Sequence, residues 1–253
     1  MPPLVMHLRS LDGHDVAGDV DLEALNKAAA ARLWNIVPLL HAQADPVGPI
    51  LNTYVEARDE GRLGNVSGIA VHTDRPCDLA TPHAPIYVYV TGPAATPGAL
   101  LAARRRYGLV MVDDSDTDLA NLDGPIDGLA PLLVRHTGTV PVDGFAAAAR
   151  DSALTLCVDL TGPPARWLPV IRLAGPERVV GLAEQPEGTL GLSAGGDLPA
   201  LGGWELPAGN GVTAAITRLR LAGFTEDDIE EVLCGTAERA MAETTPQAIR
   251  STA

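Results

Sequence analysis

The sequence predicts an α/β protein that forms a single-domain (β/α)8 barrel of the TIM type over residues 1–253. Short apolar runs of strand length recur along the chain, and segments with helical periodicity separate them. The length of 253 residues suits eight such units with no second domain. An open doubly wound sheet would show the same alternation. Because no Gly-x-Gly-x-x-Gly motif follows the first strand, we favour the barrel.

The predicted strands are mostly continuous apolar runs rich in β-branched residues, a pattern typical of strands that are covered on both faces. In chain order they span residues 4–8, 35–40, 66–72, 86–91, 109–113, 132–136, 154–160 and 179–184, with 189–193 as a short additional candidate. Each run ends at a polar or Gly-containing stretch, which indicates where the chain leaves the sheet.

Helical patterns occupy most of the intervals between these strands. The first predicted helix begins near Asp21. Further helices are predicted at about 48–60, 97–107, 142–151 and 164–174. A last helix starts at Thr225, a natural N-cap, and its acidic first turn is expected to be solvated. The run Arg104-Arg105-Arg106 is expected to form a solvated helix face, and the three cysteines to be small buried residues.

Composition excludes several classes of function. With 18 basic and 32 acidic side chains, the formal net charge is −14, which disfavours binding to a nucleic-acid backbone. No apolar run approaches the roughly 20 residues of a membrane-spanning helix, and the first residues lack a signal-peptide pattern. The cysteines form no Cys-x-x-Cys pair. We therefore expect a cytoplasmic protein without nucleic-acid or membrane partners.

Polar side chains gather at the ends of the predicted strands, where a barrel places its functional residues. They include His7, Arg9, His72, Asp113, Asp114, Arg135, His136, Asp159 and Glu184, and Asp197 follows in a Gly-rich loop. Imidazole nitrogens and carboxylate oxygens that converge at one barrel mouth could bind zinc or a similar divalent ion. In the alternative interpretation, these residues only cap loops, and Asp114, Asp116 and Asp118 form Asx-turns.

Several stretches follow one another in an order that is known from one enzyme family. They are Val5-Met6-His7-Leu8-Arg9, Val37-Pro38-Leu39, Asp113-Asp114-Ser115, Leu133-Val134-Arg135-His136, Cys157-Val158-Asp159-Leu160-Thr161, Asp197-Leu198-Pro199, Gly202-Gly203-Trp204-Glu205 and Leu206-Pro207. This order resembles the dihydroorotases of the amidohydrolase superfamily. Two family histidines are replaced, by Val5 and by Asp159. The only lysine is Lys27, so a carbamylated lysine on the fourth strand is excluded.

The resemblance implies an eroded version of the family's site. One or two zinc ions would be bound by His7, Asp114, His136 and Asp159. Arg9 would bind the carboxylate of a small anionic substrate, and Asp197 would act as the general acid and base. The implied reaction is the reversible cyclisation of N-carbamoyl-aspartate to dihydroorotate in pyrimidine biosynthesis.

Two further hypotheses follow from the missing ligands. The chain could be a non-catalytic dihydroorotase homologue that acts as a structural partner of aspartate carbamoyltransferase, with the Gly- and Pro-rich residues 186–211 as a docking loop. It could also be a barrel that binds small acids through Arg9 and Arg135 without a metal. Self-association as a homo-oligomer is compatible with each hypothesis.

Overall fold

Seven strands form one parallel sheet, in which each strand lies beside its neighbours in sequence. The computed structural model describes residues 4–5, 9–10, 22–31, 35–42, 47–76, 86–122, 126, 128–152, 154–182, 204–205 and 210–242. The strands of this sheet are β4 (Leu39–His41), β5 (Ile69–Thr73), β6 (Ile86–Val90), β7 (Leu109–Asp113), β8 (Leu132–Arg135), β9 (Thr155–Asp159) and β10 (Val179–Leu182).

Two small sheets complete the strand inventory of the described residues. The strands β1 (Leu4–Val5) and β3 (Asn35–Ile36) pair in parallel. Only Val37 and Pro38 separate β3 from β4, and the carbonyl of Pro38 accepts the Ala70 amide at 2.8 Å, so the chain stays beside β5 there. The strands β2 (Arg9–Ser10) and β11 (Trp204–Glu205) pair antiparallel.

The strand order distinguishes between the two predicted α/β architectures. A doubly wound sheet reverses its order at a switch point, whereas the seven described parallel strands run from β4 to β10 without a reversal. Right-handed connections between consecutive parallel strands then place the helices on one face. Within the described pairings, β10 bonds only to β9, so the described residues form a singly wound parallel α/β sheet.

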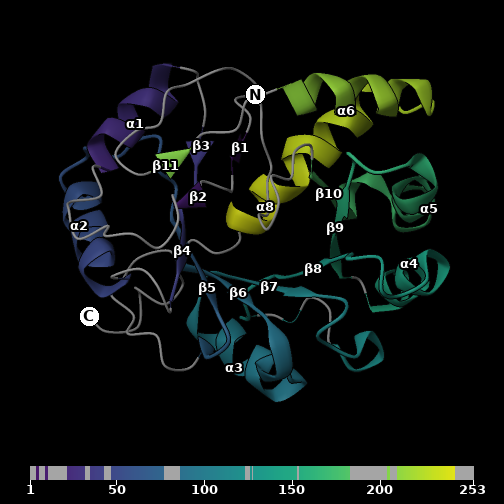
Figure 1. Cartoon of the computed structure of the whole chain (residues 1–253), viewed down its shortest axis with the longest axis horizontal. Coiled ribbons are helices and arrows are strands. Elements are labelled where there is room, and N and C mark those ends of the chain that lie inside the picture. Colours follow the sequence, from purple (N-terminus) through teal and green to yellow (C-terminus); the bar gives the residue numbers. More distant parts are fainter. Residues whose placement is uncertain are drawn as a thin grey trace.

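Helices cover one face of this sheet, which we call the outer face (Figure 1). They are α1 (Leu22–Ala31), α2 (Val47–Asp59), α3 (Pro97–Arg106), α4 (Val142–Ser152), α5 (Pro164–Ala174) and α6 (Asn210–Leu221). Their buried side chains, such as Leu51, Leu100 and Trp167, pack on alternate strand residues, such as Val88 and Val134, in one continuous core. The short 3-10 turns η2 (Gly92–Ala94), η3 (Leu119–Asn121) and η4 (Pro176–Arg178) lie in the connections.

The C-terminal helical segment reaches the opposite, inner face. It consists of α7 (Glu226–Glu230), a π-helical turn η5 (Glu231–Gly235) and α8 (Thr236–Ala242). Thr225 caps α7 in a capping box with Asp228, which confirms the predicted helix start. Ala237 and Ala240 of α8 pack in a second core with inner-face strand residues such as Tyr87, as Figure 1 shows by the position of α8 over the sheet.

Most predicted elements are present. The predicted strand 35–40 is split into β3 and β4, and neither α6 nor the strand pair of β2 and β11 was predicted. The expectation of a solvated basic face is wrong for Arg104, which is only 4% exposed and donates from Nε to the Ala130 carbonyl at 2.7 Å. Cys157 is buried as expected, whereas Cys234 is half-buried and Cys77 lies outside the described residues. The strand candidate 189–193 also lies outside them.

Candidate functional site

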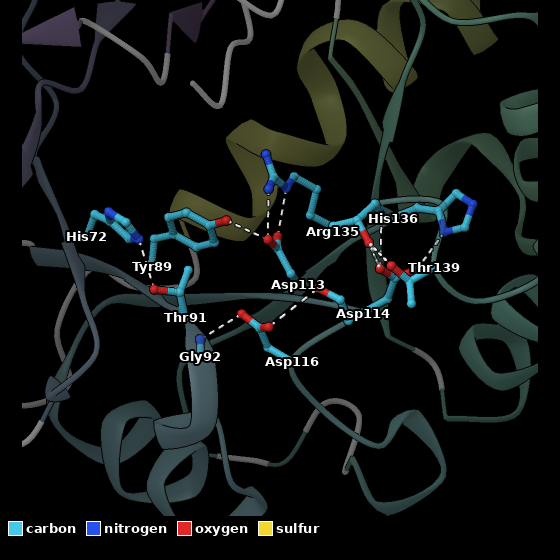
Figure 2. Close-up of polar contacts among 12 residues, drawn as sticks. His72, Tyr89, Thr91, Gly92, Asp113, Asp114, Asp116, Arg135, His136 and Thr139 are labelled. Carbon is cyan, nitrogen blue, oxygen red and sulfur yellow. Dashed lines mark hydrogen bonds and ion pairs between the residues drawn. The ribbon is translucent and has the colours of Figure 1, made fainter. Parts of the chain in front are cut away.

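The carboxyl ends of the parallel strands bring a group of polar side chains to one edge of the sheet (Figure 2). Consecutive residues of a strand point to opposite faces, and the register pairs Asp113 with Arg135 across β7 and β8. Asp113 and Arg135 therefore belong to the inner face, and Asp114 and His136 follow them on the other side. The edge carries two separate polar clusters rather than one.

The inner cluster is built around a buried carboxylate. Asp113 is 7% exposed and accepts hydrogen bonds from Arg135 Nε at Oδ1 and from Nη2 at Oδ2, each 2.7 Å long. The Tyr89 hydroxyl donates to the same Oδ2 at 2.7 Å. The Arg135 guanidinium carbon lies 5.6 Å from the Tyr89 ring centre. This paired geometry is the strong form of an ion pair, because two charge-assisted bonds fix the orientation.

Ionisation within the inner cluster follows from this geometry. Burial and the charge of Asp113 raise the pKa of Tyr89, so the phenol stays protonated and donates. Burial alone would lower the pKa of Arg135, but hydrogen bonding to Asp113 and the electrostatic interactions with its neighbours together outweigh burial and raise it. Burial also raises the pKa of the Cys157 thiol to about 12. Cys157 is therefore protonated near neutral pH and is a poor nucleophile.

His72 extends the inner cluster along the sheet edge. Its ring stacks on Tyr89 with the centroids 4.8 Å apart, and its Nε2 lies 2.9 Å from Thr91 Oγ1. Figure 2 shows His72, Tyr89, Asp113 and Arg135 in a row above the strand ends. The cluster therefore joins side chains from four consecutive strands.

The outer cluster holds the loop after β8. Asp114 is 2% exposed, and its Oδ2 lies 2.6 Å from His136 Nδ1. Its Oδ1 accepts from the backbone N–H and the hydroxyl of Thr137, at 2.9 and 2.5 Å. Burial alone would raise the pKa of Asp114, but hydrogen bonds from His136 and Thr137 outweigh burial and lower it. The His136 ring stacks on Phe145 of α4 with the centroids 4.5 Å apart, which fixes its orientation.

The neighbouring acidic residues have structural roles. Asp116 Oδ2 accepts the Gly92 amide at 2.7 Å, and Asp118 caps η3 through the Ala120 amide at 3.1 Å. Both carboxylates therefore cap loops, but the Asx-turn expectation is confirmed for Asp118 and wrong for Asp116, whose partner Gly92 is 24 residues away.

A pocket opens between the ends of β8 and β9. It has a volume of about 180 Å³ and is lined by Arg135, His136, Thr137, Gly138, Asp159, Gly162 and Arg166. Asp159 Oδ1 accepts from the backbone N–H and the hydroxyl of Thr161, at 2.8 and 2.5 Å. Within the described part of the chain, Asp159 Oδ2 and the Arg166 guanidinium have no hydrogen-bond or ion-pair partner. The pocket therefore presents two arginines and one carboxylate oxygen to a ligand.

Three of the six predicted site residues lie at this edge. Asp114 and His136 contact each other, and Asp159 lines the pocket with His136. Arg9 lies in β2, opposite Glu205 of β11. His7 and Asp197 lie outside the described residues. Sequence reasoning did not select Tyr89 or Arg166. Tyr89 could have been found, because side chains alternate along a strand and Tyr87 and Tyr89 therefore share one face of β6.

The described residues do not by themselves fit a zinc ion. Both oxygens of Asp114 are bonded to His136 and Thr137, and both oxygens of Asp113 to Arg135 and Tyr89. Among the described residues, no three His, Cys, Asp or Glu side chains gather so that they could hold a metal. The Arg135 guanidinium would also repel a divalent cation at the inner cluster.

Comparison with protein-family models, with curated proteins and with solved structures finds no match to the chain. The resemblance to dihydroorotases therefore stays a prediction. None of the helices in the described ranges is long and apolar enough to cross a membrane.

Proposed function

We propose that this chain is a (β/α)8 barrel that binds a small anionic molecule between the carboxyl ends of β8 and β9. The unbroken parallel strand order and the helices on one face support the barrel. In this proposal, β1 and β3 supply the first two strands together with β4, and the edge strand β10 approaches β1. Ligands of such sheets bind at the carboxyl ends of the strands.

The observation that carries the proposal is the pair of arginines in one pocket of an acidic protein. With a formal net charge of −14, the molecule as a whole repels anions. Arg135 uses Nε and Nη2 for Asp113, and Nη1 has no bond within the described residues. Arg166 has no partner there either, so its charge is free for a ligand. Guanidinium groups bind carboxylates and phosphates through paired hydrogen bonds.

Calorimetric titration tests this proposal. We expect saturable binding of at least one of three probes, namely dihydroorotate, N-carbamoyl-aspartate and inorganic phosphate. The variant Arg166→Gln should weaken binding about tenfold, in line with the loss of one charge-assisted contact. Arg105→Gln is the matched control, because Arg105 is exposed on α3 and does not line the pocket. Equal affinity of both variants, or no saturable binding by wild type, would contradict the proposal.

A dihydroorotase-like amidohydrolase is the second candidate. One observation favours it: Asp114 holds His136 through Nδ1 and leaves Nε2 without a partner among the described residues. A carboxylate behind an imidazole is the arrangement that orients metal-binding histidines. Near-stoichiometric zinc in the purified protein, together with dihydroorotate hydrolysis that His136→Gln abolishes, would support this function. Hydrolysis that is undetectable after zinc is added would count against it.

The structural-partner hypothesis has its own observation. Leu221, at the end of α6, is 84% exposed, and Leu173 on α5 is also exposed. Arg172 Nη2 donates to the Ala222 carbonyl at 3.2 Å, which ties these two helix ends together. Size-exclusion chromatography with aspartate carbamoyltransferase tests the hypothesis. A complex that Leu221→Ser weakens would support it, and separate elution of the two proteins would contradict it.

A further inference from the structure

One arginine from the C-terminal half of the chain contacts the wall of the pocket. Arg218 of α6 donates from Nη1 to the carbonyl oxygens of Leu160 at 2.5 Å and Thr161 at 2.6 Å. The carbonyl of Gly162 lies 3.4 Å from the same nitrogen. Three consecutive carbonyls of the β9–α5 loop therefore point at one cation that is 56 to 58 residues away in sequence.

This loop carries one side of the pocket. Asp159 precedes it, Gly162 lies within it, and Arg166 follows in the first turn of α5. Inside the loop, Asp159 accepts two bonds from Thr161, and Trp167 Nε1 donates to the Gly162 carbonyl at 3.1 Å. At its start, the Leu160 amide donates to the Leu182 carbonyl at 2.9 Å. Among the described residues, Arg218 is the side chain that donates hydrogen bonds to the carbonyls of Leu160 and Thr161.

We infer that Arg218 is a positioning residue that holds the β9–α5 loop in the shape that the ligand requires. The inference rests on the proposed binding function and goes beyond it, because Arg218 does not line the pocket. A guanidinium that bridges adjacent carbonyl dipoles replaces the water that would otherwise solvate them, and charged donors make the stronger hydrogen bonds. Without this cation, the loop can turn its carbonyls toward water and move Asp159 and Arg166 relative to Arg135.

The neighbouring Arg220 provides a matched control on the same helix. It forms an exposed ion pair with Glu226, with bonds of 2.6 and 2.7 Å, and has no contact with the loop among its described interactions. Exposed pairs of this kind contribute little to stability. Arg220→Met therefore removes the same side-chain chemistry from α6 without touching the pocket wall.

The experiment combines amide hydrogen exchange with ligand titration on the full chain. Arg218→Met should raise the exchange rate of the Thr161 amide at least about tenfold over wild type, because opening of the loop breaks its bond to Asp159. The Val110 amide, in the centre of the sheet, should exchange as in wild type, which excludes global unfolding. The affinity for dihydroorotate and for inorganic phosphate should fall about tenfold. Arg218→Lys, a single cation without the guanidinium fork, should restore part of both effects.

Two results would overturn the inference. One is a Thr161 exchange rate in Arg218→Met that equals the rate in Arg220→Met. The other is weaker binding in Arg218→Met with no change at Thr161. If wild type binds neither probe, the binding proposal fails, while faster Thr161 exchange in Arg218→Met would still support the role of Arg218 in holding the loop.

Discussion

Replacement of Arg135 by methionine should destabilise the fold, because the guanidinium is the main partner of a buried carboxylate. Asp113 is 7% exposed and accepts two 2.7 Å bonds from Arg135. Removing one member of a buried pair costs about 3–5 kcal/mol. The Arg135 side chain keeps 19% exposure, and the Tyr89 hydroxyl still donates to Asp113 in the variant. We therefore expect the lower end of that range, about 3 kcal/mol.

For a chain of this size, such a loss lowers the Tm by about 6–12 °C. Urea unfolding followed by circular dichroism measures the free energy, and calorimetry measures the Tm. The control is the double variant Asp113→Asn/Arg135→Met, which removes both charges and should recover more than half of the loss. The reasoning would be refuted by an Arg135→Met variant within about 0.5 kcal/mol of wild type, or by a double variant at least as unstable as the single one.

Three further predictions follow from other contacts. Hydrogen bonds hold the pKa of Asp114 below its unfolded value, so its stabilising contribution is present above about pH 4 and is lost as the pH falls through the folded pKa. Urea unfolding should therefore show a higher free energy of unfolding for wild type than for Asp114→Asn at pH 6, and this difference should shrink as the pH falls below about 4. Gly181→Ala should cost about 1–3 kcal/mol, because a Cβ there would lie 2.5 Å from Leu160 Cδ1, whereas Gly64→Ala meets nothing within 4 Å and should be nearly neutral. Because burial raises the pKa of the Cys157 thiol to about 12, Cys157 should resist a thiol reagent at pH 8 until the protein unfolds, as peptide mass spectrometry of the labelled chain can show.

The parallel α/β architecture could be predicted because buried strands and amphipathic helices leave different periodicities in the sequence. The β-branched runs around Val88, Val110 and Val134 had to be covered on both faces, and the structure places a core on each side of them. Helix α6 was missed because Gly211, Thr213 and Thr217 interrupt its apolar pattern. The role of Arg218 could not be predicted without this helix.

The error at Arg104 has a geometric cause. Three consecutive residues of a helix spread over about 200° of its circumference, so three adjacent arginines do not share one narrow solvated face. Arg104 is buried together with Leu100, which lies one turn earlier in α3, and with its neighbour Ala103. Its charge is accommodated by a hydrogen bond to the Ala130 carbonyl.

The contact between Asp114 and His136 agrees with the expectation that the ends of adjacent parallel strands meet. Their face was not predictable from sequence, because Asp113 and Asp114 are chemically identical and only the register decides which one points inward. The structure assigns Asp113 to Arg135 on the inner face and Asp114 to the loop after β8. The zinc ligand set stays a prediction, since His7 and Asp197 lie outside the described residues.

The most direct test of the binding proposal is an amide chemical-shift titration of the labelled protein with dihydroorotate and with inorganic phosphate. The proposal predicts saturable shifts that centre on Thr137, Gly138 and Gly162 around the pocket, and their loss in Arg166→Gln. Shifts that centre on other surfaces, or that never saturate with either probe, would contradict it.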